Sequence, residues 1–528
     1  MSFSTILSAV IEGLQAELIH VEADVSNGLP VFHMVGYLSS EVREAGERVR
    51  TAIKNSGYEY PAKRTVINLS PAALRKRGAS FDLPIAVAIL VSLGQIPPGS
   101  MKECLVVGEL SLSGHVKKVP GILPIVMEAA KQGITRCIIP GENVSEGALV
   151  KEMTVIGVKT LREAAEALQG RACTGKTEGR RQGQKGSGEQ KNPEDLPGEN
   201  SGAEEADLPD FSELRGQEHV RRAAEIAVAG GHNMLMIGPP GSGKSMAARC
   251  IAGILPPLDE KESMEITKIY SVLGLVNEER PLIRKRPFRE VHHTATRAAL
   301  TGGGAVPRPG EISLAHGGVL FLDELPEFRK NVLEVLRQPL EERCVQISRT
   351  YGNYRFPANF MLVAAMNPCP CGCYPDLEKC TCTPLQIRMY LGKISRPFLD
   401  RIDLCAEAPR VDYRSLTGSG TPEECSAEIR KRITKVRKIQ ADRYRGTDIQ
   451  NNAMLRAKDL KRWCRLDGQG ERLMEQAYSV MGLTARGYHR IIKTARTIAD
   501  LEGEENIGTD HLKEALSYRM VDEKYWRR

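Results

Sequence analysis

The sequence has no apolar run long enough to cross a lipid bilayer. Its longest run covers residues 83–93, whereas a transmembrane helix needs about 20 apolar residues in succession. The first residues also lack the basic stretch of an export signal, and Glu12 and Glu17 interrupt the apolar residues that follow. These absences argue against membrane-spanning and exported proteins. We therefore expect a soluble cytoplasmic protein with no membrane partner.

A disulfide framework and a strong excess of one charge are also missing. The 13 cysteines are irregularly spaced along 528 residues, so a small secreted disulfide scaffold is excluded. Lys and Arg number 73 against 66 Asp and Glu, and the resulting net charge of +7 suits a phosphate-rich partner without requiring one. The length predicts two or three domains.

The most informative motif is G-x-x-x-x-G-K-S, which follows the apolar residues 234–237 and precedes a predicted helix over 246–255. In this context glycines let backbone N–H groups close around a phosphate, and Lys244 reaches the β and γ oxygens. The Ser245 hydroxyl is a ligand for Mg²⁺. The motif therefore predicts binding of ATP or GTP. Its residues are Gly238, Pro239, Pro240, Gly241, Ser242, Gly243, Lys244 and Ser245.

A second apolar run, residues 319–322, ends in two carboxylates, as a buried parallel strand does when it delivers acids to a site. We expect Asp323 to hold Mg²⁺, directly or through water, and Glu324 to polarise the attacking water. The alternative is a strand end that meets solvent, and the preceding phosphate loop argues against it.

The chain divides at a polar stretch. Residues 170–207 contain almost no large apolar side chain and cannot bury enough surface to fold. We predict an α/β protein with an N-terminal α/β domain over 1–168, a flexible linker over 169–209, a parallel-sheet core over 210–409 and a helical lid over 410–528. Strands are expected at 66–69, 105–107, 137–139, 234–237, 319–322 and 360–365, and helices at 41–56, 83–93, 122–132, 423–444, 457–464, 470–481, 484–502 and 509–518.

Three polar side chains lie where a nucleotide site would use them. Asn367 ends the apolar run 361–366, where an amide can orient the lytic water; a simple strand cap is the alternative. Arg401 lies in a polar turn between apolar positions, and an ordinary ion-paired arginine is its alternative. Arg486 opens a predicted C-terminal helix, from which a cation can fold back onto the nucleotide.

These motifs, in this order, resemble those of AAA+ ATPases with a helical lid. Residues 287–293, 302–304 and 309–316 are similar to segments of the magnesium-chelatase-like branch, although Val291 stands where that branch usually has proline. With its N-terminal part included, the chain resembles the YifB/ComM family over all but the linker.

The resemblance implies roles for single residues. Asn367 corresponds to sensor 1, Arg401 to an arginine finger that acts on a neighbouring subunit, and Arg486 to sensor 2. Because such a finger completes the site of the next subunit, we expect a ring of the hexameric type that uses ATP and Mg²⁺.

The resemblance also implies a function. ComM-like proteins are ring helicases that drive branch migration during recombination of incoming DNA in natural transformation. The implied partners are single-stranded, forked or four-way DNA, other copies of the chain and recombination proteins. Two other functions stay open: a chelatase-type remodelling subunit that drives Mg²⁺ insertion into a porphyrin, and an ATP-dependent regulatory scaffold.

The N-terminal residues 1–168 look like the Lon-protease-like fold of the ribosomal-S5 type. Ser80 falls where the nucleophile of that family lies, but Leu123 occupies the position of its lysine. Without an amine to accept its proton, a serine hydroxyl is a poor nucleophile at neutral pH. We therefore expect a non-proteolytic domain.

Two insertions and one helix are candidates for contact with DNA. Residues 256–315 carry several cations, and residues 345–356 predict a β-hairpin; in related AAA+ proteins both insertions project into the ring pore. The predicted helix over 428–445 is also basic, and a solvated charged surface is the alternative for all three. The cations are Arg280, Arg284, Lys285, Arg286, Arg289 and Arg297 in the first insertion, and Arg430, Lys431, Arg432, Lys435, Arg437 and Lys438 in the helix.

Five cysteines follow Asn367 as two C-x-C pairs with a spare thiol. Four thiolates that converge from two short turns suit tetrahedral Zn²⁺. We expect a structural zinc site, and reduced, metal-free thiols are the alternative. The expected ligands are Cys369, Cys371, Cys380 and Cys382, with Cys373 outside the site.

Overall fold

The computed structural model describes residues 3–97, 104–170, 176–177, 208–304, 306–349, 352–411 and 423–526. Most of the predicted linker, residues 171–175 and 178–207, lies outside the described residues. The chain forms two compact units, one of residues 1–190 with 260–283 and one of residues 191–259 with 284–528. Among the residues described, no helix has both the length and the apolar character that crossing a membrane requires.

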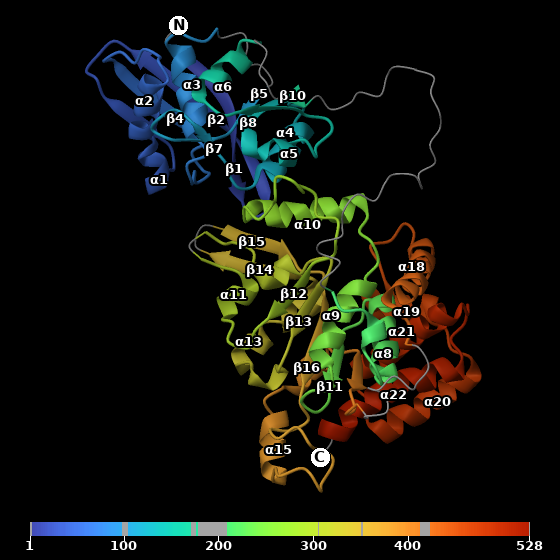
Figure 1. Ribbon diagram of the computed structural model, residues 1–528. Coiled ribbons are helices and arrows are strands. Elements are labelled where there is room, and N and C mark those ends of the chain that lie inside the picture. The colour runs from blue at the N-terminus through green and yellow to red at the C-terminus, as the bar shows by residue number, and fades with distance from the viewer. Residues whose placement is uncertain are drawn as a thin grey trace, which may run out of the picture. The chain divides into compact units, whose positions relative to one another are not determined.

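The first unit contains a mixed eight-stranded sheet in the order β10-β9-β8-β5-β1-β2-β4-β3 (Figure 1). The predicted strands at 66–69, 105–107 and 137–139 are confirmed as β4, β5 and β8. The bounds are β1 Phe3–Glu12, β2 Gln15–Ser26, β3 Phe32–Val35, β4 Arg64–Ser70, β5 Cys104–Val106, β8 Arg136–Pro140, β9 Thr154–Val158 and β10 Lys176–Thr177, beside a small hairpin of β6 Glu109–Leu110 and β7 Val116–Lys117.

Helices of this unit pack on the sheet through buried apolar faces. The longest apolar run of the sequence is α3, in which every residue is buried, so its apolar character reflects a core position. The predicted helix over 41–56 is two helices in the structure, because the helix is interrupted at Glu44. The bounds are α1 Ser40–Arg43, α2 Ala45–Asn55, α3 Asp82–Ser92, α4 Ile122–Lys131, α5 Val144–Gly147, α6 Leu161–Leu168 and α10 Glu260–Val272.

Helix α10 follows the phosphate-loop helix in the chain but packs on α4 of the first unit. The backbone N–H of Gly121 donates to the carbonyl of Ser271 over 2.8 Å. The Ser271 hydroxyl donates to the buried carboxylate of Glu146, which also accepts from the N–H of Leu123. The expected pore insertion over 256–315 is therefore divided, because its residues 260–283 belong to the N-terminal unit.

The second unit is built on a five-stranded parallel sheet in the order β12-β13-β16-β11-β17. The predicted parallel sheet is confirmed. Its central strands β13, β16 and β11 are short and wholly buried, as expected when both faces are covered. Their carboxyl ends meet at one edge, where parallel sheets place their ligands. The bounds are β11 Met234–Ile237, β12 Phe288–Val291, β13 Val319–Leu322, β16 Met361–Met366 and β17 Leu404–Glu407.

Shorter elements surround this sheet. The predicted hairpin is confirmed as β14 and β15, although Thr350 and Tyr351 at its tip lie outside the described residues. The bounds are α8 Glu218–Gly230, α9 Lys244–Ile254, α11 Arg297–Thr301, α12 Glu311–Leu314, α13 Lys330–Glu334, α14 Arg337–Glu342, β14 Cys344–Arg349, β15 Gly352–Pro357, α15 Pro384–Leu391 and α16 Arg396–Leu399.

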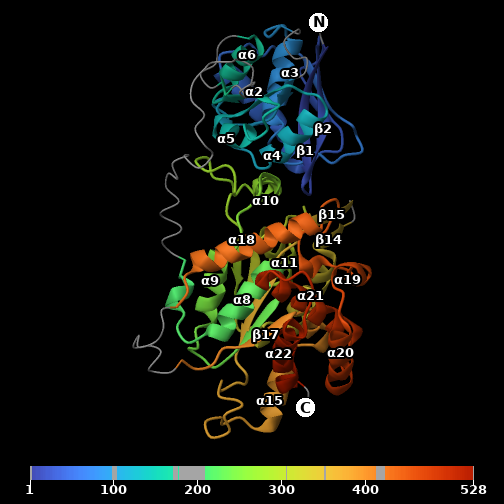
Figure 2. The ribbon, with the colours of Figure 1, turned by 90° about the vertical axis from the view of Figure 1, so that its right-hand side faces the viewer.

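The C-terminal part is helical throughout the described residues from 423 onward, as the periodicity predicts (Figure 2). Helix α21 packs against both α22 and α8. Near the C-terminal end of α21 the buried Asp500 accepts hydrogen bonds from Arg443, Arg496 and Asn452, and these bonds join three helical segments. The bounds are α18 Ser426–Arg443, α19 Ala457–Trp463, α20 Gly468–Met481, α21 Ala485–Glu502 and α22 Thr509–Trp526.

Candidate nucleotide site

The phosphate loop joins the carboxyl end of β11 to the first residue of α9, which is the strand–loop–helix context that the sequence predicts. Gly241 and Gly243 have φ values of 75° and 84°, which glycine adopts without strain. A Cβ at Gly238 would lie 2.1 Å from the carbonyl oxygen of Ala408. The loop therefore needs its glycines both for its turn and for its close packing on neighbouring backbone.

Lys244 lies inside this loop. Its ammonium donates to the carbonyl oxygens of Gly238 and Pro239 over 2.9 and 2.8 Å, and to Oδ1 of Asn367 over 3.1 Å. Burial lowers the pKa of Lys244, and the charge of Asp323 opposes that change. A buried cation whose acceptors include neutral carbonyls is well placed to bind an anion, since phosphate oxygens would stabilise its charge more strongly. The structure brings Asn367 and Lys244 together, as a shared nucleotide site requires.

Asp323 follows β13, and its Oδ2 accepts a hydrogen bond of 2.6 Å from the Ser245 hydroxyl. One carboxylate oxygen and one hydroxyl oxygen thus meet beside the phosphate loop. Oxygen ligands of this kind suit Mg²⁺, which usually binds one or two protein groups together with substrate phosphates and water. The two residues therefore fit a magnesium ion delivered with a nucleotide.

Glu324 has a left-handed backbone with φ of 51°, which is uncommon for a residue other than glycine. Its N–H donates to Oδ1 of Asp323 over 2.8 Å, which supports this conformation. Its carboxylate lies 3.2 Å from Nδ1 of His293, a residue that follows the neighbouring strand β12. The motif over 287–293 contains His293, but only the pairing of β12 with β13 places its ring beside Glu324.

Arg401 and Arg486 meet at one carboxylate that has no sequence signal of its own. The Arg401 guanidinium lies 2.6 Å from Glu341 and that of Arg486 lies 3.3 Å from the same oxygen. Arg401 also donates to the carbonyl of Arg337. Its side chain is only 6% exposed, against 58% for Arg486. Among the described residues, Arg401 contacts Glu341 and two nearby carbonyls, and Arg486 contacts Glu341, so neither guanidinium is seen at the phosphate loop.

The four expected zinc ligands converge. The sulfur atoms of Cys369, Cys371, Cys380 and Cys382 all lie within 4.8 Å of one another. Three of the separations are 3.4, 3.8 and 3.6 Å, whereas tetrahedral zinc with Zn–S bonds of about 2.3 Å needs sulfur atoms about 3.8 Å apart. The backbone N–H of Cys373 contributes most to lowering the pKa of Cys371, to about 5, which favours the thiolate that binds metals. The geometry and the donor set fit a metal ion.

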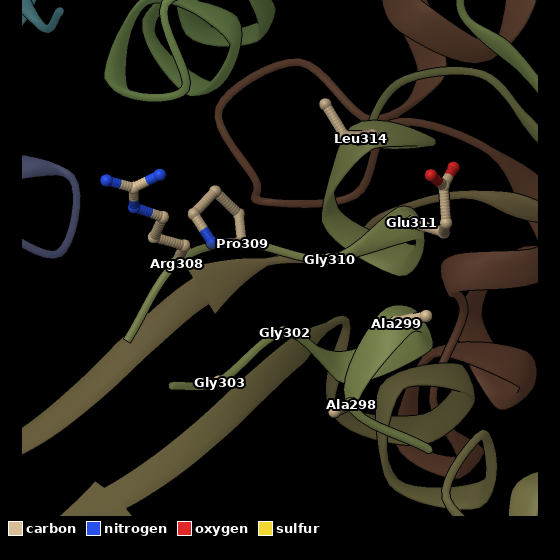
Figure 3. Close-up of a pocket in the computed structure, with 9 residues that line it drawn as sticks. All are labelled: Ala298, Ala299, Gly302, Gly303, Arg308, Pro309, Gly310, Glu311 and Leu314. Atoms are coloured by element: carbon tan, nitrogen blue, oxygen red, sulfur yellow. The ribbon is translucent and has the colours of Figure 1, made fainter. Parts of the chain in front are cut away.

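The glycine motifs over 302–304 and 309–316 form a tight structural turn, in which Gly303 and Arg308 are paired as an isolated bridge (Figure 3). A Cβ at Gly302 would lie 2.0 Å from the carbonyl oxygen of Arg308. The turn lines a cavity of about 370 Å³. Glu311, at its edge, is held by Arg289 through two hydrogen bonds of 2.7 and 2.9 Å.

Several cations proposed for DNA contact are engaged within the chain. Arg289 pairs with Glu311, and Arg286 donates to the carbonyls of Pro256 and Gly317. In α18, Arg430 donates to the carbonyl of Gly253, and Arg432 pairs with Glu225 and Glu424. These four arginines stabilise the fold. The side chains of Arg284, Lys285, Arg297, Lys431, Lys435 and Lys438 are exposed.

In the N-terminal unit, Leu123 is fully buried in the core, so the position expected for a catalytic lysine is apolar. The buried amine of Lys76 donates to the carbonyls of Pro71 and Leu74. The non-proteolytic character of this domain stays a prediction.

Three family models match most of the described chain. They are "Magnesium chelatase, subunit ChlI" over residues 210–416, "Subunit ChlI of Mg-chelatase" over residues 21–143, and "Magnesium chelatase, subunit ChlI C-terminal" over residues 423–519.

Curated relatives extend the similarity to the whole chain. Competence protein ComM of Haemophilus influenzae is 42% identical over 99% of this chain and 98% of its own length. YifB of Escherichia coli, described as uncharacterized, is 41% identical over the same shares. DNA repair protein RadA of Streptococcus pneumoniae is 40% identical over 89 residues, which are 17% of this chain and 21% of that protein. Since two relatives match it over nearly its whole length and a family model covers its nucleotide site, this chain belongs to the YifB/ComM family of magnesium-chelatase-like AAA+ ATPases.

Proposed function

We propose that this protein is a ring-shaped ATPase that moves DNA and promotes branch migration during homologous recombination and natural transformation. The observation that carries the proposal is the convergence of Lys244, Asn367, Ser245 and Asp323 at one phosphate loop, in a chain similar from end to end to a competence protein. The short similarity to a DNA repair protein and the exposed cations near the core are consistent with it.

In the proposed mechanism, the loop and Lys244 hold the β and γ phosphates of ATP. Ser245 and Asp323 would hold Mg²⁺, which supplies neutralising charge to those phosphates when it is bound. Glu324 polarises the attacking water, His293 orients the Glu324 carboxylate, and Asn367 directs the water at the γ-phosphate. The nucleotide site thus needs four strand ends, and they are neighbours in the sheet order β12-β13-β16-β11.

In this proposal Arg401 completes the site of a neighbouring copy, and Arg486 folds back onto the nucleotide as sensor 2. Both side chains converge on Glu341 in their own chain, where Arg486 is exposed and Arg401 is almost fully buried. Arg401 would therefore exchange Glu341 for the neighbour's phosphates when the ring forms. A trans-acting arginine requires a closed assembly, and we propose a hexameric ring in the cytoplasm that works with recombination proteins.

The test of this function is the response of ATP hydrolysis to DNA structure. We expect four-way or forked DNA to raise the rate of hydrolysis severalfold and the protein to convert four-way junctions into recombined duplexes only with ATP. Lys244→Ala is the control, because without the buried ammonium neither reaction should occur. A rate of ATP hydrolysis that is the same with and without every DNA substrate would contradict the proposed DNA motor. It would favour a chelatase-type subunit or a regulatory scaffold.

The same proposal assigns Zn²⁺ to the four converging cysteines. We expect elemental analysis of gently purified protein to find about one zinc ion per chain, and Cys380→Ser to lose it. Cys373→Ser is the matched control, since Cys373 lies in the same turn but outside the four-sulfur cluster. Zinc-free native protein, or equal zinc in both variants, would contradict the assignment.

A further inference from the structure

The cysteine turn is in direct contact with the phosphate loop. It begins two residues after Asn367 and closes with a hydrogen bond of 3.0 Å from the Gly372 N–H to the Cys369 carbonyl. A Cβ at Gly372 would lie 2.3 Å from Cδ of Pro240 and 2.9 Å from its Cγ. The backbone of the turn therefore rests on the ring of a phosphate-loop residue, with no room for a side chain between them.

The other side of the cluster contacts the last described helix. The Tyr374 N–H donates to the sulfur of Cys369 over 3.4 Å, and the Tyr374 ring meets that of Tyr525 edge to face with centroids 5.9 Å apart. The Tyr525 hydroxyl donates to Glu407, at the end of β17, over 2.9 Å. The four sulfurs thus sit between the phosphate loop, the strand end that carries Asn367, and α22.

This placement suggests why a metal would matter to nucleotide binding. The cysteine turn has no regular secondary structure between β16 and α15, so few backbone hydrogen bonds hold it in place. Four metal–sulfur bonds would fix its conformation, because metal binding closes a loop that is otherwise free to change shape. With the turn fixed, Gly372 holds Pro240, and the phosphate loop keeps the shape that receives a triphosphate.

We propose that the metal held by Cys369, Cys371, Cys380 and Cys382 controls nucleotide affinity by seating Gly372 against Pro240. The inference rests on the proposed ATP binding and adds a regulator to that site: a divalent, thiolate-binding metal ion such as Zn²⁺. The metal takes no part in hydrolysis. Its effect is on the shape of the phosphate loop.

The experiment compares two glycine variants by titration with a fluorescent ATP analogue. Gly372 and Gly446 both have φ of 80°, where alanine strains the backbone, but Gly446 has no heavy atom within 4 Å of its Cβ position. We expect Gly372→Ala to keep its zinc and to bind the analogue about tenfold or more weakly. Gly446→Ala should bind as the unchanged chain does. Circular dichroism of both variants establishes that they are folded.

A second measurement leaves the sequence unchanged. Removing zinc from the native protein with a chelator should weaken binding of the analogue by a similar factor, and adding Zn²⁺ back should restore it. Unchanged affinity in either the Gly372→Ala variant or the metal-free protein overturns the inference while the proposed function stands. Failure of the unchanged, zinc-loaded chain to bind the analogue would overturn both.

Discussion

Replacing Glu324 with glutamine will lower the rate of ATP turnover by about 10²–10⁴-fold, the usual contribution of a positioned acid–base group. The amide keeps the size of the side chain and its contact with His293 but no longer attracts a proton from water. The residues that hold the nucleotide, Lys244, Ser245 and Asp323, are untouched. ATP affinity should therefore stay unchanged while turnover falls, a separation that single-turnover and binding measurements resolve.

Glu327→Gln is the matched control for this experiment. Glu327 lies three residues further along, is exposed, and pairs with Lys393 through an exposed ion pair that contributes little to stability. Its replacement should leave turnover within the error of the assay. A Glu324→Gln protein that hydrolyses ATP nearly as fast as the unchanged chain would show that another group polarises the water.

Replacing Arg401 with alanine will lower turnover by about 10³–10⁵-fold, the range for loss of an arginine finger. In its own chain this guanidinium is paired with Glu341 rather than with the phosphate loop. Mixing the Arg401→Ala chain with the Lys244→Ala chain should therefore restore ATP hydrolysis. Rings assembled from Arg401→Ala and Lys244→Ala chains contain sites with an intact loop from one chain and an intact finger from the other, so the mixture should hydrolyse ATP although each protein alone does not.

Two further variants separate this role from a loss of stability. Arg396→Ala removes an exposed arginine of α16 that contacts only the carbonyl of Trp526 among the described residues, and it should leave turnover unchanged. Arg401→Lys keeps the charge near Glu341 and should fold normally, but a lysine lacks the forked geometry that matches phosphate. If the mixture stays inactive although both proteins assemble into rings, Arg401 does not act on a neighbour.

The local pattern of apolar and polar residues is enough to predict much of the fold. The strands β11, β13 and β16 are apolar runs of four to six residues because both faces of a parallel sheet are covered, so a short apolar run between polar loops identifies each of them. Helices α20 and α21 show the 3.6-residue period of apolar positions over several turns. By contrast, β1 and β2 alternate buried and less buried residues over long stretches, a signal that the strand predictions did not include.

Other features depend on contacts between residues that are distant in the chain. Helix α10 lies in the sequence between parts of the second unit, yet Ser271 hydrogen-bonds to Gly121 and Glu146 of the first. His293 lies beside Glu324 only because β12 and β13 pair. Glu341 forms ion pairs with Arg401 and Arg486, which come from distant parts of the chain. No local pattern encodes such pairs, since the distance along the chain carries no information about which surfaces meet.

The sequence by itself determined the chemistry of the phosphate loop, the two carboxylates after β13 and the grouping of the cysteines, because each depends on residue types at fixed short spacings. Only the tertiary structure decided that His293 holds Glu324, that Glu341 holds both arginines, and that Gly372 rests on Pro240. These contacts arise when strand order and close packing bring remote segments within a few ångströms, and packing of that kind is a property of the folded chain.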